Sequence, residues 1–165
     1  MCLSKIIWRK HYELTWEGNY NLFGKVENTI PLTKRENKKV SLIRDYGIGY
    51  KIFLPLSRKS YHCGMNCFHE SRWVKAWNTK IFDAFDSRIN YISGFHLFYN
   101  LSAAIEYGKD CFYGGSTIPN NFIVSSFEYK DVTAVGFEGS DLLCIVANEV
   151  RLIRHNILEN IHVSA

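Results

Sequence analysis

Apolar and polar residues alternate along several short stretches of this chain, a pattern that predicts β-strands with one face in a core. Residues 2–8 form the first predicted strand, and residues 48–54 form a second that ends before Pro55. Residues 73–77 alternate in the same way, whereas residues 61–69 fit either a strand or a loop. The second half adds predicted strands at residues 91–98, 122–129, 132–137, 142–147 and 150–154.

One helix is predicted in the second half of the chain, over about residues 100–108. Leu101, Ala104 and Ile105 recur at helical spacing. Asn100 suits the N-cap and Gly108 suits the end of the helix. We therefore expect a short helix that packs across one face of the sheet.

Short polar turns, such as those at residues 130–131 and 148–149, separate the later predicted strands. Strands joined in this way pair antiparallel. The sequence thus predicts a single α+β domain over residues 1–165, mostly antiparallel sheet with one short helix. Residues 9–47 are mixed in character and interrupted by Gly18 and Gly24, so we interpret them as a variable arm or an excursion from the core.

The composition limits the functions that the chain can have but does not identify one. With 165 residues, 47% of them apolar and 15% aromatic, the chain can bury a core of its own. The net charge of +4 is compatible with an acidic partner or nucleic acid but is too small for a dedicated nucleic-acid binder. The basic run at residues 34–39 contains no aromatic residue, and we interpret it as a solvated loop.

The five cysteines indicate a reducing compartment. Their number is odd, and the first residues lack the apolar region of a signal peptide. No apolar run reaches the length of a membrane span. We therefore expect free thiols, a cytoplasmic location in the host cell and no membrane association.

Three short motifs occur together: Met-Cys-Leu-Ser at residues 1–4, Gly-Tyr-Lys-Ile-Phe at 49–53, and Ser-Gly-Phe-His-Leu-Phe at 93–98, before an Ala-containing helix. The combination resembles small proteins of bacteriophages and mobile elements, over residues 1–8 and 48–154. The resemblance carries no reaction with it. It implies a phage-like setting, in which small proteins bind and block host machinery, including CRISPR-type defence complexes.

A weaker likeness is to the layout of ADP-ribosyltransferases. The matching positions are Tyr50 or Lys51 on an early strand, His96 on a middle strand and Glu149 on a late one. The likeness implies an enzyme that handles NAD or another nucleotide, with a carboxylate that steadies an oxocarbenium-like state. The chain departs from the pattern, because Tyr-Lys stands where Arg or His is usual and the Ser-Thr pair is missing.

The strand at 91–98 holds the strongest candidate for a catalytic or binding site. Gly94 and His96 face the same side of this strand, so bare backbone lies beside an imidazole where another group can approach. A histidine hydrogen-bonded into the core is the competing interpretation. The catalytic interpretation requires Glu128, Glu149, Lys51 or Cys2 within hydrogen-bond reach of the His96 ring.

Cys2 is a second catalytic candidate. If Met1 were removed, its thiol would lie beside a free amine, as in N-terminal nucleophile enzymes, with His96 or Lys51 as the base. A buried cysteine in a first strand is the competing interpretation.

Cysteines and histidines are densest at residues 62–69, where His62, Cys63, Cys67 and His69 are potential zinc ligands. Structural zinc sites usually join two separated ligand pairs, and no second pair is evident. We therefore expect neither a metal nor another cofactor.

Trp73 and Trp77 share one face of their segment, with Lys75 between them. Such side chains can stack on bases or ligand rings, or pack into a core. From all these patterns, the leading hypothesis is a small phage-type accessory protein that acts by binding a protein, as an inhibitor of a host or defence complex. The alternative is an enzyme, of the ADP-ribosyltransferase-like or N-terminal cysteine kind.

Overall fold

The computed structural model describes residues 3–27, 31–53, 72–76, 80–84, 89–113, 122–139, 141–155 and 157. These residues form a mostly antiparallel sheet with two helices, which confirms the predicted α+β class. The strands are β1 (Lys5–Leu14), β2 (Tyr20–Glu27), β3 (Tyr46–Phe53), β4 (Val74–Lys75), β5 (Ile81–Asp83), β6 (Asn90–Ile92), β7 (Phe95–Phe98), β8 (Ile123–Glu138) and β9 (Leu142–Arg154). The helices are α1 (Lys34–Val40) and α2 (Leu101–Tyr113).

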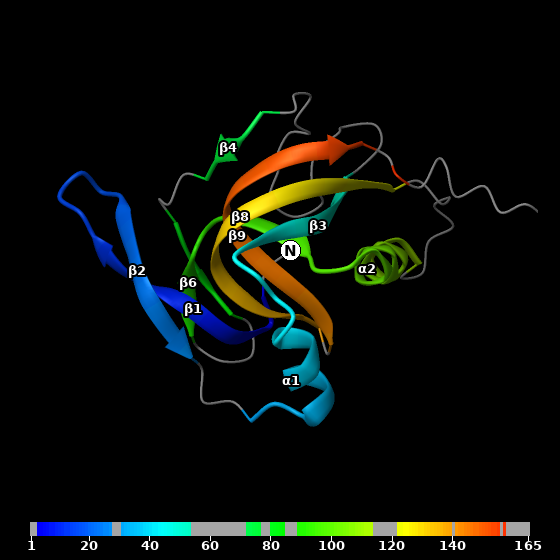
Figure 1. Cartoon of the computed structure of the whole chain (residues 1–165), viewed down its shortest axis with the longest axis horizontal. Helices are drawn as coiled ribbons and strands as arrows, with labels where there is room; N and C mark the ends of the chain where they lie inside the picture. Colours follow the sequence, from blue (N-terminus) through cyan, green and yellow to red (C-terminus); the bar gives the residue numbers. More distant parts are fainter. Residues whose placement is uncertain are drawn as a thin grey trace, which may run out of the picture.

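The main sheet has the strand order β2-β1-β8-β3-β7-β9-β4, and every pairing in it is antiparallel. β8 also pairs directly with β9, so β8, β3, β7 and β9 form a closed ring of four strands. The ring is completed by one residue pair between β3 and β7, Tyr50 with Phe98. Figure 1 shows the strongly curved β8 and β9 enclosing the centre, with the β1–β2 hairpin projecting to one side. A separate two-stranded sheet joins β5 to β6.

β8 is one continuous strand, which corrects the expectation of two strands separated by a turn at residues 130–131. Asp131 adopts a positive φ of 56°, and the register with β9 shifts near it, between Val132 and Ala134. Such bulges bend a strand without ending its ladder. The bend allows β8 to pair with β3 and then β1 along one edge while it pairs with β9 along the other. β9 likewise runs unbroken through residues 148–149, where a bend was expected.

The predicted helix exists, but it extends beyond its expected end. The Asn100 side chain accepts a hydrogen bond of 2.8 Å from the backbone N–H of Ala103, as its predicted cap role requires. Gly108 lies inside α2 rather than at its end. A Cβ at Gly108 would come within 2.6 Å of the Phe122 ring, so the glycine allows this ring to pack against the helix.

The basic run at residues 34–39 belongs to helix α1 and is not the loop that we expected. Thr33 accepts a hydrogen bond from the backbone N–H of Glu36, and the Glu36 carboxylate accepts one from the N–H of Thr33. This capping box starts the helix, and the pair of residues was visible in the sequence. Residues 9–47 therefore comprise most of the β1–β2 hairpin, α1 and the start of β3.

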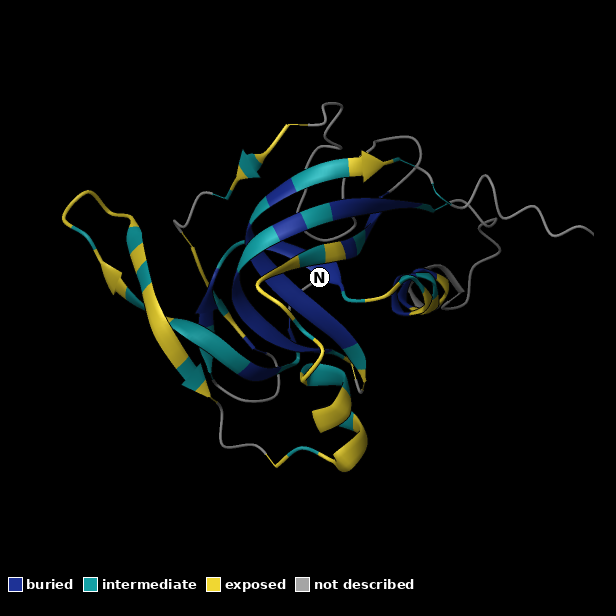
Figure 2. Ribbon diagram, in the orientation of Figure 1, coloured by how far each residue is buried: buried dark blue, intermediate teal, exposed yellow. Residues whose placement is uncertain are grey.

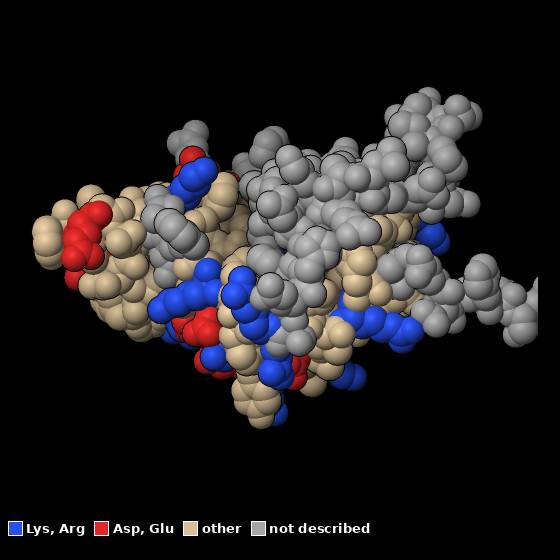
Figure 3. Space-filling view, turned by 90° about the horizontal axis from the view of Figure 1, so that it is seen from above, with Lys and Arg blue, Asp and Glu red and all other residues tan. Residues whose placement is uncertain are grey.

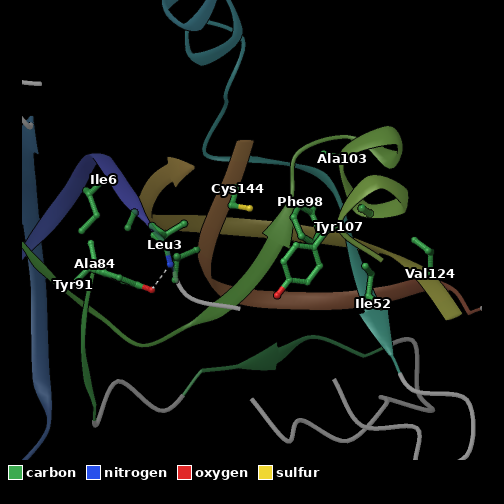
Figure 4. Close-up of a cluster of buried hydrophobic side chains, with 13 residues drawn as sticks. Leu3, Ile6, Ile52, Ala84, Tyr91, Phe98, Ala103, Tyr107, Val124 and Cys144 are labelled. Carbon is green, nitrogen blue, oxygen red and sulfur yellow. Dashed lines mark hydrogen bonds between the residues drawn. The ribbon is translucent and has the colours of Figure 1, made fainter. Parts of the chain in front are cut away.

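Buried side chains form two clusters, one on each face of the central strands, and Figure 2 shows the burial concentrated on β7, β8 and β9. In the first cluster Phe98, Ile52 and Val124 pack beneath α2 (Figure 4). The second contains Phe53, Phe127 and other large residues, with the segment around α1 packed against it. Each large apolar side chain that is fully buried contributes about 1.5–3 kcal/mol. No helix in the described part of the chain is long and apolar enough to cross a membrane.

Candidate binding groove

His96 lies in the core and not in a cleft. Its side chain is 1% exposed, and Nε2 lies 2.9 Å from the hydroxyl of Tyr91 while Nδ1 lies 3.2 Å from the carbonyl oxygen of Gly94. The Tyr91 hydroxyl also accepts a hydrogen bond of 3.0 Å from the backbone N–H of Leu3 (Figure 4). Because a carbonyl oxygen only accepts, Nδ1 carries the proton of the neutral ring, and Tyr91 donates to Nε2.

This environment keeps the imidazole uncharged. Burial, together with the nearby positive charge of Lys51, lowers the pKa of His96 from 6.5 to about 3. A ring with this pKa is neutral near pH 7 and is a weak base. The arrangement is that of a core histidine, the competing interpretation given above.

The other catalytic candidates do not meet at His96. Lys51 is buried and donates a hydrogen bond of 3.0 Å to the carbonyl oxygen of His96, not to its ring. Glu149 lies on the outside of the sheet, 2.9 Å from the ammonium group of Lys130. Tyr50 points to the opposite face of β3 from Lys51. Cys2 lies outside the described residues.

Gly94 lies against β9, at a position where the neighbouring strand leaves no room for a side chain. A Cβ at this position would come within 2.8 Å of both the Ala147 carbonyl oxygen and the Val146 side chain. The group that approaches Gly94 is therefore the neighbouring strand.

The proposed metal ligands His62, Cys63, Cys67 and His69 also fall outside the described residues, as does Trp77. Within the part that the structure describes, no group of three or more possible ligands is placed to hold a metal ion.

The described surface presents a different candidate at the start of β3. Tyr46, Ile48, Tyr50 and Ile52 alternate on one face of this strand. Tyr50 and Ile52 belong to the cluster beneath α2, but the helix does not cover the first two. Tyr46 is 74% exposed and Ile48 is 51% exposed.

Two hollows of about 340 Å³ each adjoin these exposed residues, and we call them together the β3 groove. Tyr46, Gly47, Ile48 and Tyr129 line both hollows. A Cβ at Gly47 would come within 2.8 Å of the Tyr129 hydroxyl, so the glycine lets this ring reach the groove floor. One hollow extends to Leu42, Arg44, Tyr99 and Leu101, and the other extends to Trp73, Glu128 and Lys130.

Two rows of paired residues form the sheet surface beside the groove. The first row runs across four strands, from Tyr46 through Lys130 and Glu149 to Lys75. The second runs from Ile48 through Glu128 to Arg151. Paired residues project to the same face, so the aromatic and aliphatic residues of β3 are followed by cross-strand ion pairs.

Trp73 covers these ion pairs and forms one wall of the groove. The Lys130 ammonium nitrogen lies 4.5 Å from the centre of the Trp73 ring, and the Arg151 guanidinium carbon lies 5.1 Å from it. Both cations also pair with carboxylates: Lys130 with Glu149, and Arg151 with Glu128. The stacking of cations on the indole holds the ring in place although it is 37% exposed.

Positive charge is in excess around the groove and α1. Four basic residues lie on the groove or on the sheet surface beside it, against three acidic ones, and α1, which packs against the second cluster, adds four basic residues and one acidic one. Figure 3 shows Lys and Arg side chains gathered over the middle of one face, with Asp and Glu prominent at the end where the hairpin lies. The basic residues are Lys34, Arg35, Lys38, Lys39, Arg44, Lys75, Lys130 and Arg151, and the acidic ones are Glu36, Asp45, Glu128 and Glu149.

Of the predicted binding residues, the groove region contains Trp73 and Lys75, whereas sequence reasoning missed Tyr46, Ile48 and Arg44. The alternation of large residues at 46, 48, 50 and 52 was visible. Nothing in the sequence indicated that α2 covers only half of that row.

Comparison with known proteins finds no matching family model, and neither a curated protein nor a solved structure matches the chain.

Proposed function

We propose that this chain acts by binding a protein, and that the β3 groove receives a segment of that partner. The observation that supports the proposal is the exposure of Tyr46 and Ile48 beside two hollows under a basic rim. Exposed aromatic residues next to a concave surface are typical anchors of protein interfaces. The buried, neutral His96 gives the enzymatic alternative no comparable support.

The chemistry of the groove favours an acidic partner segment with an apolar anchor. Leu42, Tyr46 and Ile48 offer apolar contact, and the exposed Arg44 lines one hollow. Lys75 is exposed on β4, at the far end of the cross-strand row that begins at Tyr46. Glu128 and Glu149 pair with Arg151 and Lys130 on the adjoining sheet surface, so these cations are neutralised and are not free to bind a continuous phosphate backbone. An apolar anchor with a few acidic neighbours therefore suits this surface better than a nucleic acid.

The resemblance to phage proteins extends this proposal to a biological role. A small protein that occupies a functional segment of a host or defence complex would inhibit it by competition. The groove is the surface through which this chain would do so.

A binding assay with defined probes tests the groove. Fluorescence anisotropy would compare a labelled 12-residue peptide containing one Trp between Glu residues, the same peptide with Lys in place of Glu, and a single-stranded oligonucleotide. We expect the acidic peptide to bind best, and Tyr46→Ala or Arg44→Glu to weaken it by roughly tenfold or more. Ile81→Ala, an exposed apolar position on β5, is the matched control.

Binding that is insensitive to Tyr46→Ala would contradict the groove as the site. Preference for the oligonucleotide would replace the protein partner with a nucleic acid. Failure of all three probes to bind at millimolar concentration would overturn the acidic-segment chemistry.

A further inference from the structure

The tip of the β1–β2 hairpin carries the most exposed large apolar side chain described in this chain. Trp16 is 93% exposed, and Leu14 beside it is 65% exposed. Glu13 and Glu17 flank the pair and are exposed as well. Leu14 and Trp16 therefore form an exposed apolar surface with a negative border, which we call the knob.

The backbone of this tip is held in a defined turn. Thr15 donates its N–H to the Asn19 carbonyl oxygen over 2.7 Å and accepts, at its own carbonyl, the N–H of Gly18 over 3.0 Å. The Thr15 hydroxyl accepts a further bond of 3.2 Å from the N–H of Asn19. Gly18 has a φ of 81°, which a side chain would disfavour. A turn fixed in this way presents Trp16 with little conformational entropy to lose on binding.

The knob and the β3 groove have complementary chemistry. The groove combines exposed apolar residues with Arg44, which lines it, and with Lys75 on the adjoining sheet surface, and the tip combines apolar residues with Glu13 and Glu17. Each hollow of about 340 Å³ is within the size range of pockets that enclose single ligand groups. The chain thus carries, on its own surface, a segment of the kind that the groove is proposed to bind.

We propose that the hairpin tip of one copy inserts into the β3 groove of a second copy. The inference rests on the proposed binding role of the groove. Insertion within one molecule is excluded by the fold, because β1 is paired to β8 and the hairpin projects away from the start of β3 (Figure 1). The contact joins two different surfaces, so successive copies add head to tail, into a ring or an open chain.

Sedimentation velocity over a range of concentrations tests this assembly with single variants. Trp16→Ala removes the knob and Tyr46→Ala removes the groove anchor, and both residues are too exposed for the changes to prevent folding. We expect the unchanged protein to associate as concentration rises, into a closed dimer if two copies insert reciprocally and into larger species if they do not, and each variant alone to remain monomeric. Glu17→Lys is expected to weaken association at least roughly tenfold. Glu27→Lys, at the exposed other end of the hairpin, is its matched control.

A mixture of the two variants gives the sharper result. Trp16→Ala keeps an intact groove and Tyr46→Ala keeps an intact knob, so an equimolar mixture can form a single contact. We expect a complex of one copy of each and nothing larger.

A monomeric unchanged protein at all concentrations, or a mixture that does not associate, would overturn the self-assembly. If the acidic peptide still binds the groove in that case, the proposed function stands without it. If the protein assembles but Tyr46→Ala has no effect, the hairpin uses another surface and this inference fails.

Discussion

The hydroxyl of Tyr91 lies 2.9 Å from Nε2 of His96 and 3.0 Å from the backbone nitrogen of Leu3, so a single buried oxygen joins the first described residue to β7. Tyr91 is fully buried, as is Leu3. The pair of hydrogen bonds explains why a histidine is accommodated in this core without charge. The contribution of the Tyr91 hydroxyl to the free energy of unfolding can be measured by removing it.

Replacement of Tyr91 by Phe is expected to lower the free energy of unfolding by about 1–3 kcal/mol, because it leaves the Leu3 N–H and the His96 ring nitrogen without this partner. Chemical denaturation with urea measures the change. Tyr99→Phe is the control, since its hydroxyl makes a surface hydrogen bond of 3.4 Å to Leu42. Equal losses for the two variants would contradict the role of the buried hydroxyl.

Acid is expected to destabilise the fold through His96. The pKa of His96 is lowered in the folded state from 6.5 to about 3, so the unfolded chain binds a proton that the folded chain excludes. The stabilisation is complete above pH 6.5 and is lost as the pH falls toward 3, with a slope of at most about 1.4 kcal/mol per pH unit.

Urea titrations at several pH values test this dependence. His96→Gln is expected to reduce the stability at pH 7 and to flatten the fall between pH 6.5 and 3. His11→Gln, at an exposed position on β1, is the matched control. A His96→Gln slope equal to that of the unchanged protein would show that this ring does not carry the effect.

Asp131 is expected to tolerate Asn better than Ala. Burial raises the pKa of this carboxyl, but hydrogen bonds from Lys10 and Asn148 outweigh burial and lower it overall. Its backbone φ of 56° favours Asn, Asp or Gly. Asp131→Ala loses both the bonds and this preference, at an expected cost of about 2–3 kcal/mol, whereas Asp131→Asn should lose less.

The pH dependence provides a second check at this position. The stabilisation from the carboxylate is present above its ordinary pKa of 3.8 and is lost as the pH falls through the lowered folded pKa. Asp131→Asn should therefore differ most from the unchanged protein above pH 4 and least at the lowest pH. Thermal unfolding of Ala and Asn variants with the same midpoint would argue against this account.

Gly136→Ala is expected to disturb the attachment of the hairpin. A Cβ at Gly136 would lie 2.2 Å from the Lys5 carbonyl oxygen, which belongs to the backbone of β1 and cannot rotate away. We expect a loss of about 2–3 kcal/mol and faster proteolytic cleavage within the hairpin. Gly139→Ala is the comparison, because a Cβ at this position meets no atom within 4 Å. The expected loss of stability comes only from its positive φ of 61° and is about 1–2 kcal/mol. A larger loss of stability for Gly139→Ala than for Gly136→Ala would contradict this prediction.

Local patterns in the sequence predicted the class of fold and most strands, because alternation and capping depend on neighbouring residues. Asn100 capped α2 as expected. The two long strands were divided in prediction, since Asp131 and Asn148 have the composition of turns. Their side chains instead bond to each other across the bulge, over 2.8 Å, which depends on residues 17 positions apart.

The candidate site was harder to predict for a related reason. The single strand predicted at residues 91–98 is two strands in the structure, because Gly94 falls in the break between β6 and β7 and only His96 lies on β7. The partners of these two residues, Tyr91 and Ala147, come from elements whose packing local patterns do not specify. The groove residue Tyr46 belongs to an amphipathic row that resembles any core strand. Its exposure results from the limited reach of α2, a tertiary property.

In the ring formed by β8, β3, β7 and β9, the junction between β3 and β7 contains a single residue pair, and we call this junction the seam. Tyr50 pairs with Phe98, and the Lys51 side chain bonds to the His96 carbonyl oxygen beside it, whereas β8 and β9 are joined along most of their length. Local opening costs least where the fewest bonds are broken. Amide hydrogens flanking the seam should therefore exchange with solvent deuterium through partial opening, while those in the middle of the β8–β9 hairpin exchange only when the whole molecule unfolds.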